Sequence, residues 1–597
     1  MVNQEEKDVE VWIRCWQFGM WGLCGLAAVM MAAGSSAFGQ RAEAISTSKL
    51  PSNAIWLDSL DLSKTDQGWD SPKSGKSVGG SPLTLDGLVY QHGVGITDDH
   101  ADWAGAVIYL SAGTTERPES VRTGNEPPIR IASGTSAEPA IHGPRIVGTT
   151  PGRPFLFLIP ATGKAPLSFS ANNLPEGLTL DSKTGIISGS LKKPGTTVVE
   201  LAVTSPRGSA TRKLKIAAGD HKLALTPPMG WNSWNVWARS IDDAKVRAAA
   251  DWMVKSTLAA HGYQYINIDD CWEGGRDENG EITTNEKFPD MKALADYVHA
   301  KGLKLGIYSS PGPKTCAGFE GSYRHEEQDA ATYAKWGIDY LKYDWCSYGH
   351  IAKDHSREEL TKPYRVMREA LDKCGRDIVY SLCQYGTGSV WEWGTEVGGN
   401  CWRTTGDIRD TWGSMSHIGF SQDGHEKYAS PGHWNDPDML VVGNVGWGPN
   451  LHRTRLTPNE QITHITLWCL LSSPLLTGCD LSKMDQFTVD VLTNDEVLDV
   501  NQDPLGKPAG RRAKDGVTEV WARPLWDGTV AVGLFNSGGR KCDVTAKWFD
   551  LGLAGPQAVR DLWQKKDLGE FEGSFAASVP AHGAVMVKIG KPTRTDW

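Results

Sequence analysis

Clustered basic charge is missing from this sequence, and so are the cysteine spacings of a metal ribbon. The chain of 597 residues has no long run of Lys and Arg, and its formal net charge is −10. Nucleic acid is therefore not expected as a partner, because phosphate binding needs clustered basic side chains. The 11 cysteines include no Cys-x-x-Cys pair. This spacing argues against a zinc ribbon.

Long hydrophobic runs are also missing after residue 40. The membrane-like stretch 18–39 has an apolar part that ends near residue 33 and is followed by small residues. It is short for a spanning helix and is typical of a secretory signal, although the residues before it are acidic. We expect residues 1–40 to be a signal peptide or an N-terminal anchor, with no other membrane contact. We also expect export to a bacterial-type periplasm or the extracellular space.

Tryptophan, in contrast, is abundant, with 25 Trp against 15 Tyr. Indole rings stack on the apolar faces of sugars, but they also fill large cores, so the count favours a carbohydrate partner only modestly. The length is too great for one hydrophobic core and predicts two to four domains.

Composition and periodicity change along the chain and predict its domains. Residues 46–114 are Gly-rich with short β-like runs, and 115–137 have the composition of a linker. Short apolar runs between turns predict a β-sandwich at 138–218. Strands and helices alternate over 223–505, and a second antiparallel β domain is expected at 512–592.

The alternating region predicts a (β/α)8 TIM barrel, an α/β fold. Eight strand–helix units over about 270 residues have the size of this fold. The expected strands are 229–231, 265–269, 304–308, 340–344, 378–383, 402–405, 434–440 and 474–477. The expected helices include 242–261, 291–301, 326–336, 358–373 and 458–471.

The ends of the expected strands carry an unusual set of polar side chains. Residues at the C-terminal ends of barrel strands line one mouth, where active sites of this fold lie. They include Trp231, Trp234, Asp269, Asp270, Tyr308, Lys342, Asp344, Cys383, Gln384, Arg403, Asp407, Asp436 and Asp438. Asp344 and Asp407, on the fourth and sixth strands, are the pair that retaining glycoside hydrolysis needs, with carboxyls roughly 5–6 Å apart.

The charges around these two carboxyls predict different protonation states. Lys342 is two residues before Asp344 on one strand, so both side chains face the same side. The positive charge of Lys342 is expected to lower the pKa of Asp344. The negative charges crowding the mouth are expected to raise the pKa of Asp407, which must hold a proton.

A structural role or a metal site would also account for such carboxylates. A single Asp at a strand end is most often a helix cap or turn residue, and Asp436 and Asp438 flank a proline. A carboxylate cluster can also hold magnesium. Lys342 and Arg403 argue against a metal, because cations repel it, and activity that survived exhaustive chelation would exclude one.

Residues 223–505 resemble glycoside hydrolase family 27, which contains α-galactosidases and α-N-acetylgalactosaminidases. The resemblance rests on motifs that occur in order along the whole expected barrel. They are Thr-Pro-Pro-Met-Gly-Trp-Asn-Ser-Trp at 226–234, Ile-Asn-Ile-Asp-Asp-Cys-Trp at 266–272, Leu-Gly-Ile-Tyr at 305–308, Lys-Thr-Cys-Ala-Gly at 314–318, Asp-Tyr-Leu-Lys-Tyr-Asp at 339–344, Trp-Arg-Thr-Thr-Gly-Asp-Ile at 402–408 and Trp-Asn-Asp-Pro-Asp-Met-Leu at 434–440.

The resemblance implies a retaining double displacement without a cofactor or metal. Asp344 matches the family nucleophile and Asp407 the acid/base. Asp269 and Asp270 match the carboxylates that hold the 4- and 6-hydroxyls of galactose. Trp234 matches the platform under the sugar. The other matching sugar contacts are Tyr308, Lys342, Arg403 and Asp438. The resemblance also implies the disulfides Cys316–Cys346 and Cys383–Cys401.

Three positions depart from the family pattern. Gln384 stands where many members carry a Glu that reads the sugar 2-hydroxyl, and Tyr385 follows it. The bulky Trp345 follows the expected nucleophile. Cys271 lacks the upstream partner of eukaryotic members and is expected to be a free thiol. The flanks resemble accessory modules of secreted bacterial enzymes: Leu-Pro-Glu-Gly-Leu-Thr-Leu-Asp-Ser-Lys-Thr-Gly at 174–185 resembles an Ig-like module, and 54–111 resembles part of a carbohydrate-binding module.

The sequence thus predicts an exported exo-acting α-galactosidase with a carbohydrate substrate. The alternatives within the family are α-N-acetylgalactosaminidase and β-L-arabinopyranosidase. Gln384 and Tyr385 argue against room for an acetamide, and the pair Asp269 and Asp270 argues for a sugar that has its exocyclic hydroxymethyl group. A non-catalytic carbohydrate-binding protein is the alternative from another class. The presence of both Asp344 and Asp407 argues against it.

Overall fold

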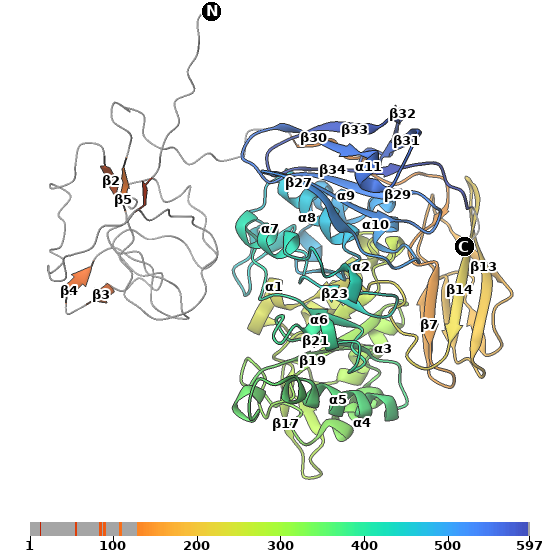
Figure 1. The fold of residues 1–597 in the computed structure, drawn as a ribbon. Coiled ribbons are helices and arrows are strands. Elements are labelled where there is room, and N and C mark those ends of the chain that lie inside the picture. Colours follow the sequence, from red (N-terminus) through yellow and green to blue (C-terminus); the bar gives the residue numbers. More distant parts are fainter. Residues whose placement is uncertain are drawn as a thin grey trace, which may run out of the picture. The chain divides into compact units, whose positions relative to one another are not determined.

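The computed structural model describes residues 128–594 and the backbone of five short strands that precede them (Figure 1). Strands β1 and β2 both pair with β5, and β3 pairs with β4; their bounds are β1 Trp12–Ile13, β2 Ala54–Trp56, β3 Leu83–Leu85, β4 Leu88–Tyr90 and β5 Val107–Tyr109. The chain divides into two compact units, Met1–Arg122 and Thr123–Trp597. Apart from these strands, the expected signal or anchor at 1–40 and the expected module at 46–114 lie outside the described residues, as does most of the linker.

The last residues of the expected linker lie against the second unit. The backbone N–H of Ile129 donates to Oδ1 of Asn459, and that of Ala132 donates to the carbonyl of Trp563. Ile129 and Ile131 also pack against the main hydrophobic core. This part of the chain is therefore bound to the body of the protein.

The segment 138–218 folds as the expected Ig-like β module. One sheet has the order β10-β13-β14-β7, a second has the order β11-β12-β8, and β6 pairs with β9. Along β13, Val199, Leu201 and Val203 alternate with more exposed residues and are buried in the core of the module. The strands are β6 Ala140–Ile141, β7 Ile146–Thr149, β8 Phe155–Leu158, β9 Ala161–Thr162, β10 Ser168–Asn172, β11 Leu178–Leu180, β12 Ile186–Gly189, β13 Gly195–Ser205 and β14 Gly208–Ala218.

The central domain is the expected eight-stranded parallel barrel. The strand order is β23-β22-β21-β20-β19-β16-β15-β26, and a parallel bridge from Leu440 to Thr477 brings the two ends of this order together. Neighbouring strands in the barrel are successive in the sequence, except for β15 and β26, the first and the last, which pair in parallel. The strands are β15 Met229–Asn232, β16 Tyr265–Asn267, β19 Lys304–Ser309, β20 Tyr340–Asp344, β21 Val379–Cys383, β22 Cys401–Arg403, β23 Trp434–Asp436 and β26 Leu475–Thr477.

Helices connect these strands, and local sequence signals start several of them. The carboxyl of Asp242 accepts from the backbone at the start of α2, and Thr457 and Glu460 form a capping box at the start of α8. The helices are α1 Trp234–Trp237, α2 Asp243–Lys255, α3 Met291–His299, α4 Glu326–Trp336, α5 Arg357–Lys373, α6 Val390–Trp393, α7 Trp412–Phe420, α8 Pro458–Leu470, α9 Gln486–Leu492 and α10 Asp495–Asn501. Short elements between them are η4 Ala238–Ser240, η5 Ala259–His261, β17 Glu273–Arg276, β18 Ile282–Thr284, η6 Tyr348–His350, η7 Glu426–Tyr428, β24 Asn444–Val445, β25 His452–Arg453 and η8 Leu481–Lys483.

The C-terminal domain is the expected antiparallel β-sandwich. A six-stranded sheet has the order β27-β28-β29-β34-β31-β32, and β30 pairs with β33. Val532, Leu534 and Val587 belong to its buried core. Its elements are β27 Gly510–Asp515, β28 Thr518–Pro524, β29 Val530–Asn536, β30 Cys542–Lys547, α11 Trp548–Leu551, β31 Pro556–Asp561, β32 Lys566–Glu572, β33 Ser574–Val579 and β34 Ala584–Ile589.

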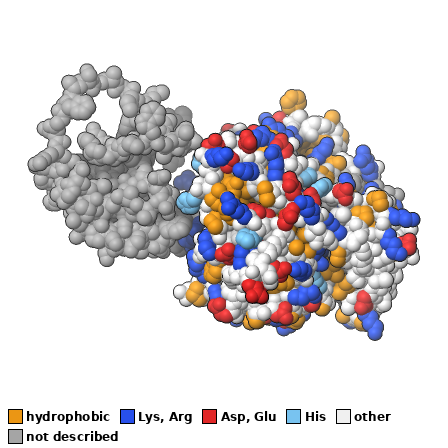
Figure 2. All heavy atoms as spheres, turned by 90° about the horizontal axis from the view of Figure 1, so that it is seen from below, with side chains coloured by type: hydrophobic (Ala, Val, Ile, Leu, Met, Phe, Trp, Pro, Cys, Tyr) orange, Lys and Arg blue, Asp and Glu red, His pale blue; other side chains and the backbone are white. Residues whose placement is uncertain are grey.

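On the face shown in Figure 2, acidic and basic side chains are interspersed over the described residues. None of the helices in the described part of the chain is long and apolar enough to cross a bilayer.

Candidate active site

The carboxyl ends of the barrel strands carry the predicted carboxylates. Asp344 is the last residue of β20, and Asp407 lies in the loop after β22. Asp269 and Asp270 follow β16, and Asp438 follows β23. All these strands run parallel, so their carboxyl ends share one rim of the barrel.

Asp344 is held by three donors. The hydroxyls of Tyr308 and Tyr385 donate to its Oδ2 at 3.0 and 2.8 Å, and the backbone N–H of Trp345 donates to Oδ1 at 2.7 Å. The side chain is only 3% exposed. Burial raises the pKa of Asp344, while Lys342 and the two tyrosines act in the opposite direction. The expected net lowering of this pKa by Lys342 is therefore wrong, because the loss of solvent has the larger effect.

Lys342 is bound to a different carboxylate. Its Nζ donates to Oδ2 of Asp269 at 2.8 Å, and Nδ2 of Asn232 donates to the same oxygen at 2.9 Å. Burial disfavours the charged amine, but Asp269 and other anionic groups raise the pKa of Lys342 above its usual value. The lysine therefore stays charged and fixes the carboxylate that follows the second strand.

The neighbouring carboxylate, Asp270, is fixed by the backbone. Its Oδ2 accepts from the N–H of Ala317 and its Oδ1 accepts from the N–H of Cys271, both at 2.7 Å. Burial raises the pKa of Asp270 to about 6, although these hydrogen bonds oppose the shift.

Arg403 joins the carboxylates on the other side of the rim. One of its nitrogens lies 3.1 Å from Oδ1 of Asp407 and 3.0 Å from Oδ2 of Asp438. Asp438 also accepts from the backbone N–H of Ile408 at 2.9 Å, and its φ of 86° is unusual for a residue with a side chain. Asp436 accepts from the backbone N–H of Asp438 at 2.9 Å, which is the behaviour of a turn residue.

The raised pKa expected for Asp407 is wrong for the free site. Its side chain is 51% exposed, and it pairs with Arg403. Partial burial acts to raise the pKa of Asp407, but Arg403 and Lys342 hold it below its usual value. The crowded negative charges predicted a raised pKa, whereas the contact with Arg403 has the larger effect.

The remaining residues predicted to contact the sugar also lie at or just after the ends of barrel strands. Tyr308 is buried on β19, with its hydroxyl between Asp344 and Cys346. Trp234 is half-buried and begins α1 after β15. Gln384 follows β21 and is fully buried, and neither atom of its amide has a hydrogen-bond partner among the described residues.

One of the two expected disulfides is present. Cys316 and Cys346 are bonded, whereas Cys383 and Cys401 are buried free thiols, so the second pairing was wrong. Strand register explains this. Cys401 is paired with Ser381 on the neighbouring strand, so Cys383 lies two residues further along the barrel, out of reach of a disulfide. Cys271 is a buried free thiol, as expected.

Two contacts within this site were not predicted from the sequence. Asn232 ends β15, between the two tryptophans that were singled out, and it contacts Asp269. Tyr385 lies just beyond the end of β21 and contacts Asp344. Both could have been found by considering every polar residue at or just after a strand end.

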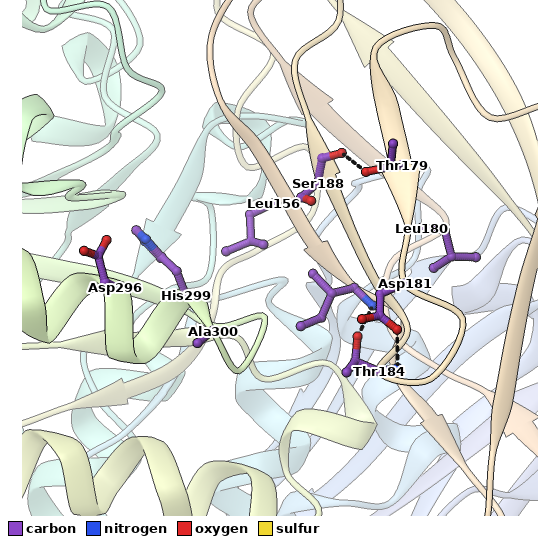
Figure 3. A pocket seen from close by; sticks show the side chains of 10 residues that line it. Leu156, Thr179, Leu180, Asp181, Thr184, Ser188, Asp296, His299 and Ala300 are labelled. Carbon is purple, nitrogen blue, oxygen red and sulfur yellow. Dashed lines mark hydrogen bonds between the residues drawn. The ribbon is translucent and has the colours of Figure 1, made fainter.

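A separate cavity of about 620 Å³ lies between the Ig-like module and α3. Figure 3 shows Leu156, Asp181 and Ser188 on the module side, and Asp296 and His299 on the side of α3. The carboxyl of Asp181 already accepts from the backbone of Lys183 and Thr184. This cavity lies away from the strand ends and brings together no set of groups like that around Asp344.

Comparison with known proteins agrees with this arrangement. Residues 226–503 match the family model described as alpha galactosidase A, residues 515–589 match the alpha galactosidase C-terminal beta sandwich domain, and residues 138–218 match an Ig domain. Alpha-galactosidase 2 of Arabidopsis thaliana is 46% identical over 373 residues, covering 62% of this chain and 90% of that protein. Alpha-galactosidase A of Cellvibrio japonicus is 44% identical over 393 residues, covering 62% and 93%.

The chain is also similar to solved structures of alpha-galactosidases. A candidate alpha-galactosidase/melibiase from Bacteroides fragilis has a TM-score of 0.72 at 38% identity, covering 76% of this chain and 98% of that one. Alpha-galactosidase I of Mortierella vinacea has a TM-score of 0.58 at 34% identity, covering 63% and 100%. The barrel, its paired carboxylates and these relatives together establish that this chain belongs to glycoside hydrolase family 27.

Proposed function

We propose that this glycoside hydrolase is a retaining, exo-acting α-galactosidase that releases terminal α-linked D-galactose from oligo- or polysaccharides. The observation that carries the proposal is the placement of Asp344 at the end of the fourth barrel strand and of Asp407 just after the sixth. The chain is 46% identical to an alpha-galactosidase over 373 residues. Both carboxyls lie at the mouth of the barrel, one buried and one half-exposed. Retaining hydrolysis needs two carboxyls with separate roles.

In the first step, an oxygen of Asp344 forms a bond to the anomeric carbon as the bond to the leaving oxygen breaks. Asp407 gives its proton to that oxygen. In the second step, Asp407 takes a proton from water, the water oxygen bonds to the anomeric carbon, and the ester bond to Asp344 breaks. Atoms and charge balance over the two steps, and both carboxyls return to their starting states.

Asp407 must gain a proton when substrate binds, because Arg403 holds its pKa low in the free site. A sugar over the rim would remove water from this half-exposed carboxyl. Desolvation favours the neutral acid, so binding would raise the pKa of Asp407 toward the acid role. Protonation would also loosen its ion pair with Arg403.

Sugar selection would come from the fixed carboxylates on the other side of the rim. Asp269 and Asp270 are held by Lys342, Asn232 and backbone donors, with orientations set before binding. We assign them the 4- and 6-hydroxyls of galactose. An epimer that cannot donate to them would leave buried carboxylate oxygens without a hydrogen bond from the sugar, which disfavours its binding. Trp234, Tyr308, Arg403, Asp438 and Gln384 are proposed as the other sugar contacts.

The alternative to this proposal is a different sugar specificity within the same family. A β-L-arabinopyranosidase from Geobacillus stearothermophilus matches at 29% identity with a TM-score of 0.56. The test is a panel of aryl glycosides: α-galactoside, α-N-acetylgalactosaminide and β-L-arabinopyranoside. We expect kcat/KM to be highest for the α-galactoside by at least about tenfold, because Asp270 is fixed where an exocyclic hydroxyl would bind. A higher value for either other glycoside would overturn the assignment.

Asp344→Asn serves as the control in this panel, since it should abolish turnover without changing the fold. Residual activity equal to wild type in that variant would contradict the proposed mechanism.

We also propose that the protein is exported. The apolar stretch 18–39 lies outside the described residues, and the Cys316–Cys346 disulfide is of a kind that persists in oxidising compartments. Cell fractionation should find the protein outside the cytoplasm. N-terminal sequencing of that fraction should show that the chain is cleaved near residue 40. An intact N-terminus in the cytoplasmic fraction would contradict this proposal.

A further inference from the structure

The carboxylate of Asp344 accepts a hydrogen bond that has no role in the reaction proposed above. Its Oδ2 accepts hydrogen bonds from two tyrosines on different elements: Tyr308 on β19 at 3.0 Å and Tyr385 after β21 at 2.8 Å. Tyr308 is one of the proposed sugar contacts. Tyr385 has no assigned role, although its hydroxyl is the closer of the two.

The backbone and ring of Tyr385 are held in one position. Its φ of 56° is uncommon for a residue with a side chain and persists where the surroundings enforce it. The next residue, Gly386, donates its N–H to the carbonyl of Arg403 at 3.0 Å. The guanidinium of Arg403 lies 5.6 Å from the centre of the Tyr385 ring. The hydroxyl therefore points at Asp344 from a fixed support.

We propose that Tyr385 is a positioning residue for the nucleophile: its hydroxyl fixes the rotation of the Asp344 carboxylate and stabilises its charge when that charge returns in the second step. This inference rests on the proposed retaining function. Tyr385 keeps its proton throughout, so the balance of the reaction is unchanged.

The two steps would depend on this hydrogen bond differently. The proposed reaction needs Asp344 as an anion when it attacks, turns it into a neutral ester in the intermediate and returns it to an anion as the ester breaks. A hydrogen bond to a charged acceptor is stronger than one to a neutral acceptor. The contact from Tyr385 therefore assists the departure of Asp344 in the second step more than its attack in the first.

Several ionisable groups surround Asp344, and the hydrogen bond from Tyr385 is one of several influences on the pKa of Asp344. Burial raises the pKa of Asp344, while the charge of Lys342 and the hydrogen bonds from Tyr385 and Tyr308 oppose the rise. Loss of the Tyr385 hydroxyl would raise this pKa further. The ionisable groups around Asp344 are Lys342 on β20, Tyr308 on β19, Cys383 on β21, Tyr385 after β21 and Tyr364 on α5.

The test is Tyr385→Phe, assayed with an aryl α-galactoside that has a good leaving group. We expect kcat to fall about 10- to 100-fold, the worth of a hydrogen bond to a charged group. KM should fall with it, a burst of phenol should appear because the intermediate accumulates, and the acid limb of kcat/KM should move to higher pH.

Tyr343→Phe is the matched control. Tyr343 precedes Asp344 on the same strand, and its buried hydroxyl has no partner among the described residues. Its removal deletes the same atom close to the nucleophile without touching the carboxylate. We expect its kcat, burst and pH profile to stay within about twofold of wild type, since no hydrogen bond is lost.

Replacing Tyr385 by 3-fluorotyrosine gives a second variant of nearly native shape. The more acidic phenol is a stronger donor, so the acid limb should move to lower pH. The inference is overturned if wild type is active and neither Tyr385 variant moves the acid limb, or if Tyr385→Phe lowers kcat and kcat/KM equally without a burst. A wild-type protein inactive on the α-galactoside would overturn the proposed function instead.

Discussion

Nζ of Lys342 lies 2.8 Å from Oδ2 of Asp269 and not against Asp344, two residues further along the same strand. The lysine therefore supports sugar binding more directly than it supports the nucleophile. Asp269 is only 2% exposed, and Lys342 is the basic group bound to it. Removing one member of a buried ion pair leaves an uncompensated charge, which is strongly unfavourable.

Lys342→Met should therefore lower kcat/KM for an aryl α-galactoside by about 100-fold or more, from the cost of an unpaired buried carboxylate. The loss should appear largely in KM. Lys304→Met is the control, because Lys304 begins strand β19 at the opposite end of the barrel. That change should leave KM near the wild-type value. An unchanged KM in Lys342→Met would show that Asp269 does not depend on this contact.

The Cys316–Cys346 disulfide should support both stability and the site. It closes a separation of 30 residues, and Sγ of Cys346 lies 3.2 Å from the hydroxyl of Tyr308. Replacing both cysteines by alanine should lower the free energy of unfolding by about 2–4 kcal/mol, measured by urea denaturation. It should also lower kcat, because Tyr308 donates to Asp344.

Cys383→Ala gives the comparison for that experiment, since Cys383 is a free thiol. Reducing agent should lower the free energy of unfolding of wild type and of Cys383→Ala by the same amount. It should leave that of the double alanine variant unchanged. Equal stability of wild type with and without reductant would argue against the disulfide.

The Ig-like module should be attached to the barrel in a pH-dependent way. Oδ1 of Asp495 lies 2.9 Å from Nδ1 of His142 in the module and 2.6 Å from Nδ1 of His261 in the barrel. Burial favours the neutral acid, but the two histidines hold the pKa of Asp495 well below its usual value. Its contribution to stability is therefore present above pH of about 4 and is lost as pH falls further.

Asp495→Asn should lower the free energy of unfolding by roughly 2 kcal/mol at pH 7, the worth of hydrogen bonds to a charged group, and by less at pH 3. Asp499→Asn is the control, because Asp499 is 48% exposed and its partner Arg212 also donates to the carbonyls of Ile141 and Gly143. It should change stability by less than about 1 kcal/mol at either pH. An equal effect of Asp495→Asn at both pH values would contradict the role of its charge.

The barrel and most of its site could be predicted because the apolar runs of the sequence show where the strands end. Asp344 ends an apolar run, and Asp269 and Asp270 follow another, so a shared rim follows from the fold alone. Side-chain contacts could not be predicted in this way. The pairing of Lys342 with Asp269 depends on the distance between two strands, and that of Arg403 with Asp407 depends on the path of the loop after β22. The register of β21 and β22 likewise decided against a bond between Cys383 and Cys401.

The stereochemistry of hydrolysis distinguishes a double displacement from a single one. Wild type would be mixed with an aryl α-galactoside, and the first galactose released would be followed by proton NMR before mutarotation. A double displacement through Asp344 predicts that α-galactose appears first, and that Asp344→Asn releases none. Initial release of β-galactose would mean a single displacement by water and would contradict the retaining mechanism.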